Sequence, residues 1–339
     1  MSAVLLSCII PAFNAERTIA RTLGALLTER SSLEVIVVND GSSDRTLAIV
    51  ELFCNMYANL KVITRQNSGP GVSRNIGIEE ATGRYVTFCD ADDLALPVNQ
   101  LKLADIANEN DAQVACGTGF SMHDYQKITP FHDDHITQLI ASDQTNVEEK
   151  NILKFLLEPT SCTKIFLKSF LVENKIHFSL GQFEDVLFTY KALMTASRIV
   201  VKPFPLFIYD IYGTASRSNE RSMTRFDIFT SLSEILPRLV QGGLPMLEVA
   251  ALAISLMKLT LWCFEYVPEE GVSKFRGLMF DHFVLLRARI DGSGWRGVQK
   301  FITSPLDQRA FLVLDGFLYS RWSRDEFNKQ IESIRRKPN

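Results

Sequence analysis

The sequence predicts an α/β fold in which a parallel sheet carries helices on both faces, followed by a helical C-terminal region. Through the first hundred residues, short apolar runs alternate with segments of helical periodicity, which is typical of βαβ units with right-handed crossovers. Polar clusters follow the apolar runs, as expected at the carboxyl ends of strands. After Arg225 the hydrophobic pattern is helical throughout.

Four apolar runs fit buried strands, and helical segments follow them. The strands are expected at residues 4–10, 33–38, 60–64 and 85–89. The helices are expected at residues 15–27, 47–54 and 72–81, and from near Pro97. Asn14 is a candidate N-cap of the first helix because its side chain can accept from a free N–H group.

Polar residues gather directly after each predicted strand. The four clusters are residues 11–14, 40–42, 65–69 and 90–93. Because the carboxyl ends of parallel strands meet at one edge, where ligands bind near the switch point of strand order, we interpret the clusters as one site. The alternative is four unrelated solvated loops.

Three carboxylates, Asp90, Asp92 and Asp93, follow the apolar strand at 85–89. Like charges beside a low-dielectric core are costly unless a metal or a basic ligand neutralises them. Their hard oxygen atoms favour Mg²⁺ or Mn²⁺. The same residues also fit a solvated turn that caps the helix near Pro97.

The chain has neither a Gly-rich dinucleotide turn nor a P-loop sequence. We therefore expect phosphates to be held through a metal at the aspartates. Asp40 is placed to accept a hydrogen bond from a base N–H group, and Arg65 and Arg74 to add positive charge near a diphosphate. Each arginine also fits an ordinary surface ion pair.

Several of these residues belong to blocks that occur in a fixed order. The blocks are Ile9-Ile10-Pro11-Ala12-Phe13-Asn14, Val37-Val38-Asn39-Asp40-Gly41-Ser42-Ser43-Asp44, Gln66-Asn67-Ser68-Gly69, Arg74-Asn75-Ile76-Gly77-Ile78 and Asp90-Ala91-Asp92-Asp93. As an ordered set they resemble the inverting GT-A glycosyltransferases of family 2, and the resemblance covers about residues 1–215. It implies the GT-A fold, with a mixed, mainly parallel sheet.

The resemblance implies a donor site. Asp40 corresponds to the aspartate that reads the nucleobase, usually uracil, and Arg74 falls where the family carries a basic residue near the donor. The wall beside the base and the rest of the implied nucleotide-sugar site comprise Pro11, Ala12, Phe13, Asn14, Asn67, Asp90, Ala91 and Asp92.

Asp90 and Asp92 match the metal-binding DxD pair of the family. The resemblance makes Asp92 the direct ligand, places Asp90 near the ribose and metal, and gives Asp93 the role of orienting its neighbours.

Residues 161–166, 176–178 and 181–188 resemble the region before and around the ED motif of the family. The resemblance makes Asp185 the catalytic base and Glu184 a supporting residue. An inverting transfer needs one carboxylate to deprotonate the acceptor hydroxyl, which agrees with this role. Both residues also fit the start of a helix, where the macrodipole favours acidic side chains. Residues 209–218, with Tyr212, resemble a segment that closes over the diphosphate.

We divide the 339 residues into a GT-A domain at 1–218 and a helical C-terminal domain at 219–339. Its helices are expected at residues 228–239, 248–265, 274–290, 306–320 and 325–334. They fit a small bundle, or a platform for a lipid-linked acceptor with residues 335–337 on anionic lipid. Residues 119–150 are expected to form a mobile loop that selects the acceptor, and His132 and His135 there are a second candidate metal site.

The formal net charge of −3 argues against nucleic acid as the main partner. Six cysteines without paired spacing indicate buried thiols in a reducing compartment. The N-terminus lacks a signal-peptide pattern, and charges interrupt the apolar segment 244–267, so a buried helix is expected there. We therefore expect a cytoplasmic protein, or one peripheral at the cytoplasmic membrane face.

The sequence thus predicts a metal-dependent inverting glycosyltransferase that moves a sugar from a nucleotide donor, UDP-linked, to a hydroxyl of a glycan or glycolipid acceptor. Two alternatives remain open: a metal-dependent nucleotidyltransferase and a non-catalytic sugar-nucleotide-binding protein.

Overall fold

The computed structural model describes residues 4–29, 32–123, 127–130, 134–141, 147–210, 221–290, 294–302 and 304–334. The chain forms two compact units. Unit 1 comprises Met1–Asp143 and Pro159–Ser216, and unit 2 comprises Gln144–Glu158 and Arg217–Asn339. This division differs from the predicted single boundary after residue 218, because the helix Val147–Leu156 packs with a helix of the C-terminal region.

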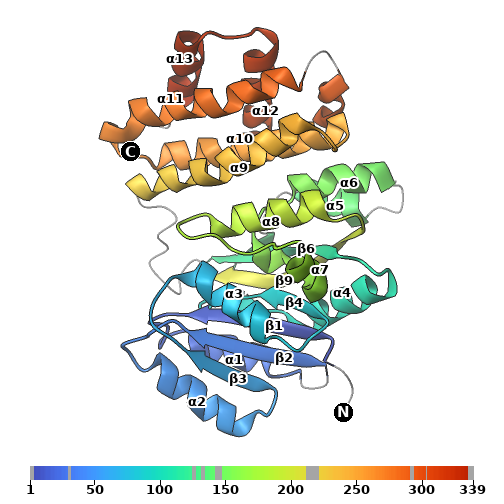
Figure 1. The fold of residues 1–339 in the computed structure, drawn as a ribbon, viewed down its shortest axis with the longest axis vertical. Coiled ribbons are helices and arrows are strands. Elements are labelled where there is room, and N and C mark those ends of the chain that lie inside the picture. The colour runs from blue at the N-terminus through green and yellow to red at the C-terminus, as the bar shows by residue number, and fades with distance from the viewer. Residues whose placement is uncertain are drawn as a thin grey trace. The chain divides into compact units, whose positions relative to one another are not determined.

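The first part of unit 1 alternates strands and helices as predicted. Its elements are β1 (Leu6–Ala12), α1 (Ile19–Leu26), β2 (Leu33–Asn39), α2 (Thr46–Met56), β3 (Leu60–Thr64), α3 (Pro70–Glu80) and β4 (Tyr85–Phe88). Strand β1 pairs in parallel with β2 and β4, and β2 pairs in parallel with β3. The carboxyl ends of these four strands therefore share one edge of the sheet (Figure 1).

The second part of unit 1 completes a mixed sheet. Its elements are β5 (Leu94–Ala95), α4 (Pro97–Glu109), β6 (Val114–His123), β7 (Lys127–Pro130), α5 (Asp134–Ala141), β8 (Lys164–Leu167), α7 (Lys168–Glu173), α8 (Glu184–Thr195) and β9 (Ile199–Asp210). The described strands form one sheet in the order β3-β2-β1-β4-β8-β6-β9-β5, with β7 paired to β6. Strand β8 is antiparallel to β4 and β6, which makes the sheet mixed.

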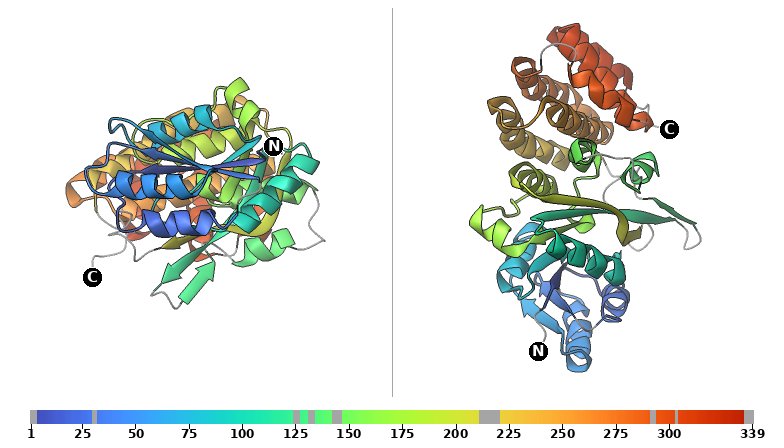
Figure 2. Two further views of the ribbon diagram at one scale, coloured as in Figure 1. Left: turned by 90° about the horizontal axis from the view of Figure 1, so that it is seen from below. Right: turned by 90° about the vertical axis from the view of Figure 1, so that its right-hand side faces the viewer.

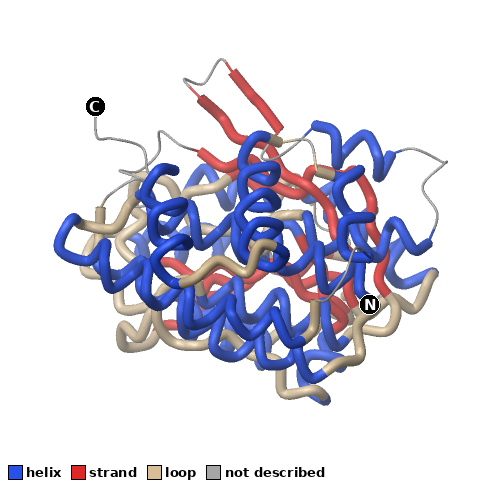
Figure 3. Tube along the Cα trace, turned by 90° about the horizontal axis from the view of Figure 1, so that it is seen from above, coloured by secondary structure: helices blue, strands red, loops and turns tan. Residues whose placement is uncertain are grey.

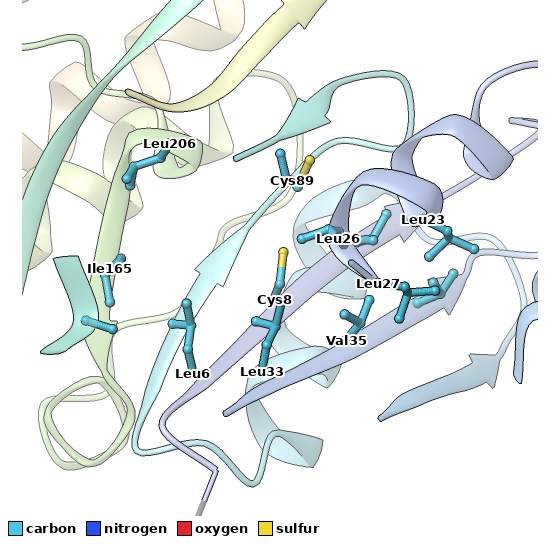
Figure 4. Packing of buried hydrophobic residues seen from close by; sticks show 14 of the residues in the cluster. Leu6, Cys8, Leu23, Leu26, Leu27, Leu33, Val35, Cys89, Ile165 and Leu206 are labelled. Carbon is cyan, nitrogen blue, oxygen red and sulfur yellow. The ribbon is translucent and has the colours of Figure 1, made fainter. Parts of the chain in front are cut away.

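Helices cover both faces of the sheet in unit 1 (Figure 2). On one face, Leu6 and Cys8 of β1 belong to the same apolar cluster as Leu23 and Leu26 of α1 (Figure 4). On the other face α3 lies so close that a Cβ added at Gly77 would be 2.3 Å from the side chain of Ile9. This alternation follows from the two-residue period of a strand, which sends successive side chains to opposite faces.

Two parts of unit 1 differ from the sequence prediction. The apolar runs at 199–201 and 206–209 predict two short strands on either side of Pro203 and Pro205. They instead form one strand, β9, whose register against β6 shifts twice between Cys116 and Phe120. Such irregularities let a strand carry proline, which has no N–H group, without ending the sheet. The mobile loop expected at 119–150 instead contains the end of β6, β7, α5 and the helix α6 (Val147–Leu156).

Unit 2 consists of helices in its described residues, and the strands in Figure 3 belong to unit 1. Besides α6 it contains α9 (Ile228–Gln241), α10 (Met246–Glu265), α11 (Val272–Phe283), α12 (Pro305–Tyr319) and α13 (Arg324–Ile334). The helix expected at 274–290 ends as an α-helix at Phe283 and continues as a 3₁₀ helix over Val284–Ala288.

Polar and charged side chains connect α6 to α10 within unit 2. Lys154 and Glu248, both buried, form an ion pair with an N–O distance of 3.1 Å. The Ser255 hydroxyl donates to the carbonyl of Phe155 at 2.6 Å. These contacts join residues about a hundred positions apart, which explains why hydrophobic periodicity alone assigns α6 to the wrong unit.

Helix α10 is the one helix among the described residues that is long and apolar enough to cross a membrane. Of its most apolar 18-residue stretch, 83% is buried inside the structure. The core helix of a helical unit has the same length and composition, and the burial of α10 favours that interpretation.

Candidate active site

A cleft of about 700 Å³ opens in unit 1 at the carboxyl edge of β1 and β4. The predicted site residues that line it are Pro11, Phe13, Asn14, Arg74, Asp90, Ala91, Asp92 and Glu184. The predicted site residues that do not line it are Ala12, Asp40, Asn67, Asp93 and Asp185. The remaining lining residues, to which the sequence assigned no role, are Ala15, Glu16, Arg17, Thr18, Asp44, Pro70, Gly181, Gln182 and Phe183.

Asn14 fastens the loop after β1 to the loop after β2. Its backbone has a φ of 49°, its amide oxygen accepts from the N–H of Ser43 at 2.9 Å, and its own N–H donates to the Ser42 hydroxyl at 3.0 Å. The prediction that Asn14 caps the first helix is wrong, because Thr18 occupies the N-cap position of α1. The left-handed backbone that asparagine tolerates turns its side chain toward the neighbouring loop instead.

Asp44 also connects the loop after β1 to the loop after β2. Its carboxylate accepts from the backbone N–H of Glu16 at 3.0 Å and from the backbone N–H of Thr46 at 2.9 Å. Burial raises the pKa of Asp44, but the hydrogen bonds from Thr46 and Glu16 outweigh it and bring the pKa below its usual value. The carboxylate is therefore ionised at neutral pH and lines the cleft as a fixed negative charge.

Asp40 does not line the cleft, but it binds the segment that leads to Pro70, which does line it. It is 3% exposed, and its two oxygens accept from the N–H groups of Ser68 at 3.0 Å and Gly69 at 2.8 Å. These bonds fix the start of α3, where Pro70 lines the cleft. A carboxylate oxygen accepts a second hydrogen bond through its other lone pair, so the base-reading role of Asp40 stays a prediction.

Asn67, the other predicted donor residue in this region, is exposed. Its main chain packs on Gly41, where an added Cβ would lie 2.9 Å from the Asn67 nitrogen. Gly41 also has a φ of +73°, so glycine is required there for both reasons.

Arg74 joins the two acidic motifs of the cleft. Its Nη2 lies 2.7 Å from Oδ1 of Asp90, and its Nη1 lies 2.6 Å from Oε1 of Glu184. Burial disfavours the charged guanidinium, but the negative charges of Asp90 and Glu184 outweigh it and raise the pKa of Arg74 above the ordinary value. A permanent positive charge therefore lies between the residues that follow β4 and those that begin α8.

Helix α3 also holds the segment before α8. The side chain of Asn75 accepts from the N–H of Phe178 at 2.8 Å and donates to its carbonyl at 2.9 Å. A Cβ added at Gly71 would lie 2.6 Å from the carbonyl oxygen of Ser179. Asn75 of the predicted block at 74–78, together with Gly71 before it, thus lets α3 touch this segment.

Aromatic rings support the start of α8. Phe178 and Phe188 are stacked with their centroids 3.8 Å apart, and Phe88 at the end of β4 meets both edge-on at 5.0 and 5.8 Å. Phe183, which precedes the helix, has a left-handed backbone with a φ of 61°. The packing therefore fixes the first turn of α8 relative to the end of β4.

Asp185, in that first turn, has a perturbed carboxyl group. Burial and the charge of Glu184 raise the pKa of Asp185 to about 7, against the opposing charges of Arg74 and Lys164. The negative charge of Asp90 also contributes to this raised pKa of Asp185. A carboxylate with a pKa near the operating pH is suited to accept a proton, so the environment fits the predicted base.

Lys164 is a residue of this group that the sequence did not single out, although it lies within the block at 161–166. It is fully buried, and its Nζ donates to the carbonyl of Thr160 at 3.0 Å and to the hydroxyl of Thr163 at 2.9 Å. A lysine inside a β-strand is rarely buried without a charged neighbour, which is the signal that sequence inspection could have used.

The aspartates after β4 differ in exposure. The side chain of Asp90 is 42% exposed, and Asp92 is half-buried, and both line the cleft. Asp93 is 2% exposed and accepts from the backbone N–H of Asp210 at 3.2 Å. Burial and the charges of Asp90 and Asp92 raise the pKa of Asp93 well above its usual value. Asp93 thus binds protein rather than facing the cleft.

Asp90 and Asp92 fit a hard divalent cation that is shared with a ligand. Within the described residues no three His, Cys, Asp or Glu side chains gather in a way that would hold a metal ion. Mg²⁺ and Mn²⁺ are commonly bound by one or two carboxylates together with substrate phosphates and water. The carboxylates of Asp90 and Asp92, which line the cleft, meet that requirement.

Three predictions fall outside the described residues or side chains. They are the metal site at His132 and His135, the closing segment containing Tyr212, and the basic residues 335–337.

The family comparison matches the site. Residues 7–166 match the model of glycosyl transferase family 2. This region is a family 2 glycosyltransferase domain. It extends from β1 to β8 and includes the cleft residues of the first two β-strand loops, Arg74 and the acidic loop.

Two relatives carry glycosyltransferase names. The uncharacterized glycosyltransferase YibD of Escherichia coli (strain K12) is 28% identical over 222 residues, which are 62% of this chain and 62% of YibD. The poly(ribitol-phosphate) beta-N-acetylglucosaminyltransferase TarS of Staphylococcus aureus (strain Mu50) is 30% identical over 225 residues, which are 60% of this chain and 35% of TarS. The chain therefore spans less than two thirds of the length of either relative.

The likeness to solved structures covers nearly the whole chain, beyond the residues that match the family model. The crystal structure of S. aureus TarS 1-349 in complex with UDP-GlcNAc has a TM-score of 0.70 at 22% identity, covering 97% of this chain and 91% of that one. The mannosyltransferase PcManGT of Pyrobaculum calidifontis, in complex with GDP-Man and Mn²⁺, has a TM-score of 0.52 at 13% identity, with 97% and 86% coverage. The predicted GT-A fold with a C-terminal helical region is confirmed.

Proposed function

We propose that this protein is a metal-dependent inverting glycosyltransferase that moves a sugar from a UDP-linked donor to a hydroxyl group of a cell-surface glycan or glycolipid. The observation that carries the proposal is the junction at Arg74. There the guanidinium contacts Asp90 at 2.7 Å and Glu184 at 2.6 Å, beside the Asp185 carboxyl with a pKa of about 7. Glu184, the neighbour of the proposed proton acceptor Asp185, therefore lines the same cleft as the proposed donor-site residues Arg74 and Asp90.

The reaction assigns different tasks to the two acidic pairs. Asp185 accepts the proton of the acceptor hydroxyl while that oxygen attacks the anomeric carbon from the face opposite the diphosphate. The new C–O bond forms as the bond to the diphosphate oxygen breaks, so the configuration at the anomeric carbon inverts. Arg74 forms an ion pair with Glu184 at 2.6 Å, and the charges of both residues act on Asp185.

Asp90 and Asp92 are the residues that would hold the cation. When bound, Mn²⁺ or Mg²⁺ stabilises the charge of the departing diphosphate as a Lewis acid. Support comes from the exposure of Asp90 and from Mn²⁺ in the PcManGT complex. Arg74 adds a fixed positive charge on the same side of the cleft.

The donor and acceptor classes rest on the relatives. UDP is proposed because the TarS structure with the higher TM-score is a complex with UDP-GlcNAc. A glycan acceptor is proposed because TarS is named for transfer to poly(ribitol-phosphate). A cytoplasmic location, with or without peripheral contact with the inner membrane face, is part of the same proposal, because nucleotide-sugar donors are cytoplasmic metabolites in the predicted reducing compartment.

The test is donor turnover by the purified full chain. UDP release from a panel of UDP-, GDP- and dTDP-sugars is measured with Mn²⁺, with Mg²⁺ and with EDTA, and the anomeric configuration of the released or transferred sugar is read by NMR. We expect Mn²⁺-dependent turnover of a UDP-sugar and a product of opposite anomeric configuration.

Three results would contradict the proposal in different ways. Donor binding without turnover, with or without acceptor, would identify a sugar-nucleotide-binding protein. Formation of a nucleotide-sugar and pyrophosphate from a nucleoside triphosphate and a sugar 1-phosphate, without UDP release from any UDP-sugar, would identify a nucleotidyltransferase. Retention of configuration would remove the single-displacement mechanism and the role of Asp185 as its base.

A further inference from the structure

Helix α1 holds the main chain of the acidic loop at residues 90–93. The Thr22 hydroxyl lies 3.0 Å from the carbonyl oxygen of Ala91 and 2.8 Å from that of Asp93. Nη2 of Arg21 donates to the carbonyl of Asp92 at 2.7 Å. Two neighbouring residues of one helix thus bind the three carbonyl groups that follow Asp90.

The other arm of Arg21 reaches the end of β9. Nη1 of Arg21 forms an ion pair with the carboxylate of Asp210, whose side chain is fully buried. The N–H of Asp210 in turn donates to the carboxyl of Asp93 at 3.2 Å. The contacts therefore close a ring that runs from α1 through the acidic loop to β9 and back.

Arg74 and Arg21 both bind the acidic loop at residues 90–93, but they bind different parts of it. Arg74 binds the side chain of Asp90 and lines the cleft. Arg21 binds the main chain at Asp92 and does not line the cleft. Arg21 is 189 positions from Asp210, and it belongs to none of the blocks on which the family resemblance depends.

We propose that Arg21 is a positioning residue for the metal and donor site, because it fixes the main chain of Asp92 so that the carboxylates of Asp90 and Asp92 face one cation. This inference rests on the proposed function. Residues that orient metal ligands without touching the metal commonly contribute 10–100-fold to metal affinity. A planar guanidinium is suited to the task, because its fork binds a carbonyl and a carboxylate at once.

The experiment compares the full-length wild type with Arg21→Gln and Arg84→Gln. Arg84 is a matched control, because it forms an ion pair with Asp111 at 3.4 Å at the opposite end of β4. Isothermal calorimetry measures UDP binding across a Mn²⁺ titration, and donor turnover is measured in parallel. We expect the Mn²⁺ concentration for half-maximal UDP binding to rise about tenfold in Arg21→Gln and to stay unchanged in Arg84→Gln.

Excess Mn²⁺ separates positioning from a general structural role. At saturating Mn²⁺ and donor, kcat of Arg21→Gln is expected within about threefold of the wild type, because the ligands themselves are intact. A kcat loss that excess Mn²⁺ does not restore would refute the inference. If Arg21→Gln does not fold, Arg21→Lys decides the question in its place, since lysine keeps the ion pair with Asp210 but cannot bind both partners as a fork.

The two proposals fail in different ways. A wild type that binds no UDP, or binds it without regard to Mn²⁺, would refute the proposed function and this inference together. A wild type with Mn²⁺-dependent UDP binding and an Arg21→Gln variant with the same Mn²⁺ requirement would refute this inference alone.

Discussion

The pair Asp90–Asp92 and the pair Glu184–Asp185 meet at Arg74, yet the protein supports them in different ways. The first pair lies on a loop whose main-chain carbonyls are bound by α1, and the side chain of Asp90 is 42% exposed. The second pair begins a helix that packs on stacked aromatic rings, and burial raises the pKa of Asp185 to about 7.

This difference shows how carboxylates that surround one arginine can have two different tasks. Carboxylates that line the cleft can share a cation with a diphosphate. A carboxylate held near neutrality by burial and a like charge can accept a proton during the reaction and return it afterwards. The environment, more than the residue type, decides which aspartate has which role.

The largest effect is expected from Asp185→Asn. Removing the proton acceptor should lower kcat about 10³-fold, while UDP affinity in Mn²⁺ stays within about threefold, because the amide keeps the shape of the site. Steady-state turnover and calorimetry measure the two quantities. Asp105→Asn on the exposed side of α4 is the control and should match the wild type. Full activity of Asp185→Asn would remove this residue from the mechanism.

Asp92→Asn changes the pair Asp90–Asp92. Compared with Asp185→Asn, it should lower kcat less and UDP affinity more. We expect Mn²⁺-dependent UDP affinity to fall about a hundredfold, at the upper end of what the loss of a supporting residue costs a metal site. Binding without Mn²⁺ should not change. Equal Mn²⁺ dependence in the variant and the wild type would show that the cation, if any, binds elsewhere.

The sequence predicted the parts of the site that depend on local pattern. Apolar runs bounded by turns placed β1, β2 and β4 within about two residues, and the rule that parallel strands end at one edge brought Asn14, Asp90 and Asp92 to one cleft. The rule succeeded for the loops after β1 and β4 because it needs no knowledge of side-chain contacts. It also placed Asp40 and Asn67 in that site, and neither residue lines the cleft.

The parts that failed depend on long-range pairing. Asn14 was expected to cap its own helix, but its side chain binds Ser43 on another loop. Arg21 has no local feature that indicates its bond to Asp210. Residues 144–158 belong to unit 2, in which Lys154 of α6 forms a buried ion pair with Glu248 of α10. Hydrophobic periodicity carries no information on such partners, since each joins segments that are distant in sequence.

The pH dependence of the rate should report the Asp185 environment. Because Asp185 must be ionised to accept a proton, kcat/KM should fall about tenfold for each pH unit below an apparent pKa near 7. Glu184→Gln removes the neighbouring negative charge that raises this pKa, so its acidic limb should move to lower pH. Rate measurements between pH 5 and 9 test this, and an unmoved limb would show that Glu184 does not set the charge of the base.

The smallest expected effect concerns the pH dependence of thermal stability, which should differ between variants of the two acidic pairs. The pKa of Asp185 is about 7 in the folded protein, above the value of about 3.9 for an unfolded aspartate, so the folded state binds more protons between those values. The contribution of Asp185 to stability is therefore present below about pH 4 and is lost as pH rises toward 7.

Asp185→Asn removes that titration and should raise the melting temperature at pH 8 by a few degrees, at roughly 2–4 °C for each kcal/mol, with little change at pH 4. Differential scanning calorimetry without metal or donor measures both values. Asp92→Asn, which leaves the Asp185 carboxyl in place, should show no gain that grows with pH. A gain of equal size in both variants would mean that the two pairs share one electrostatic environment, and the division of tasks between them would then need another cause.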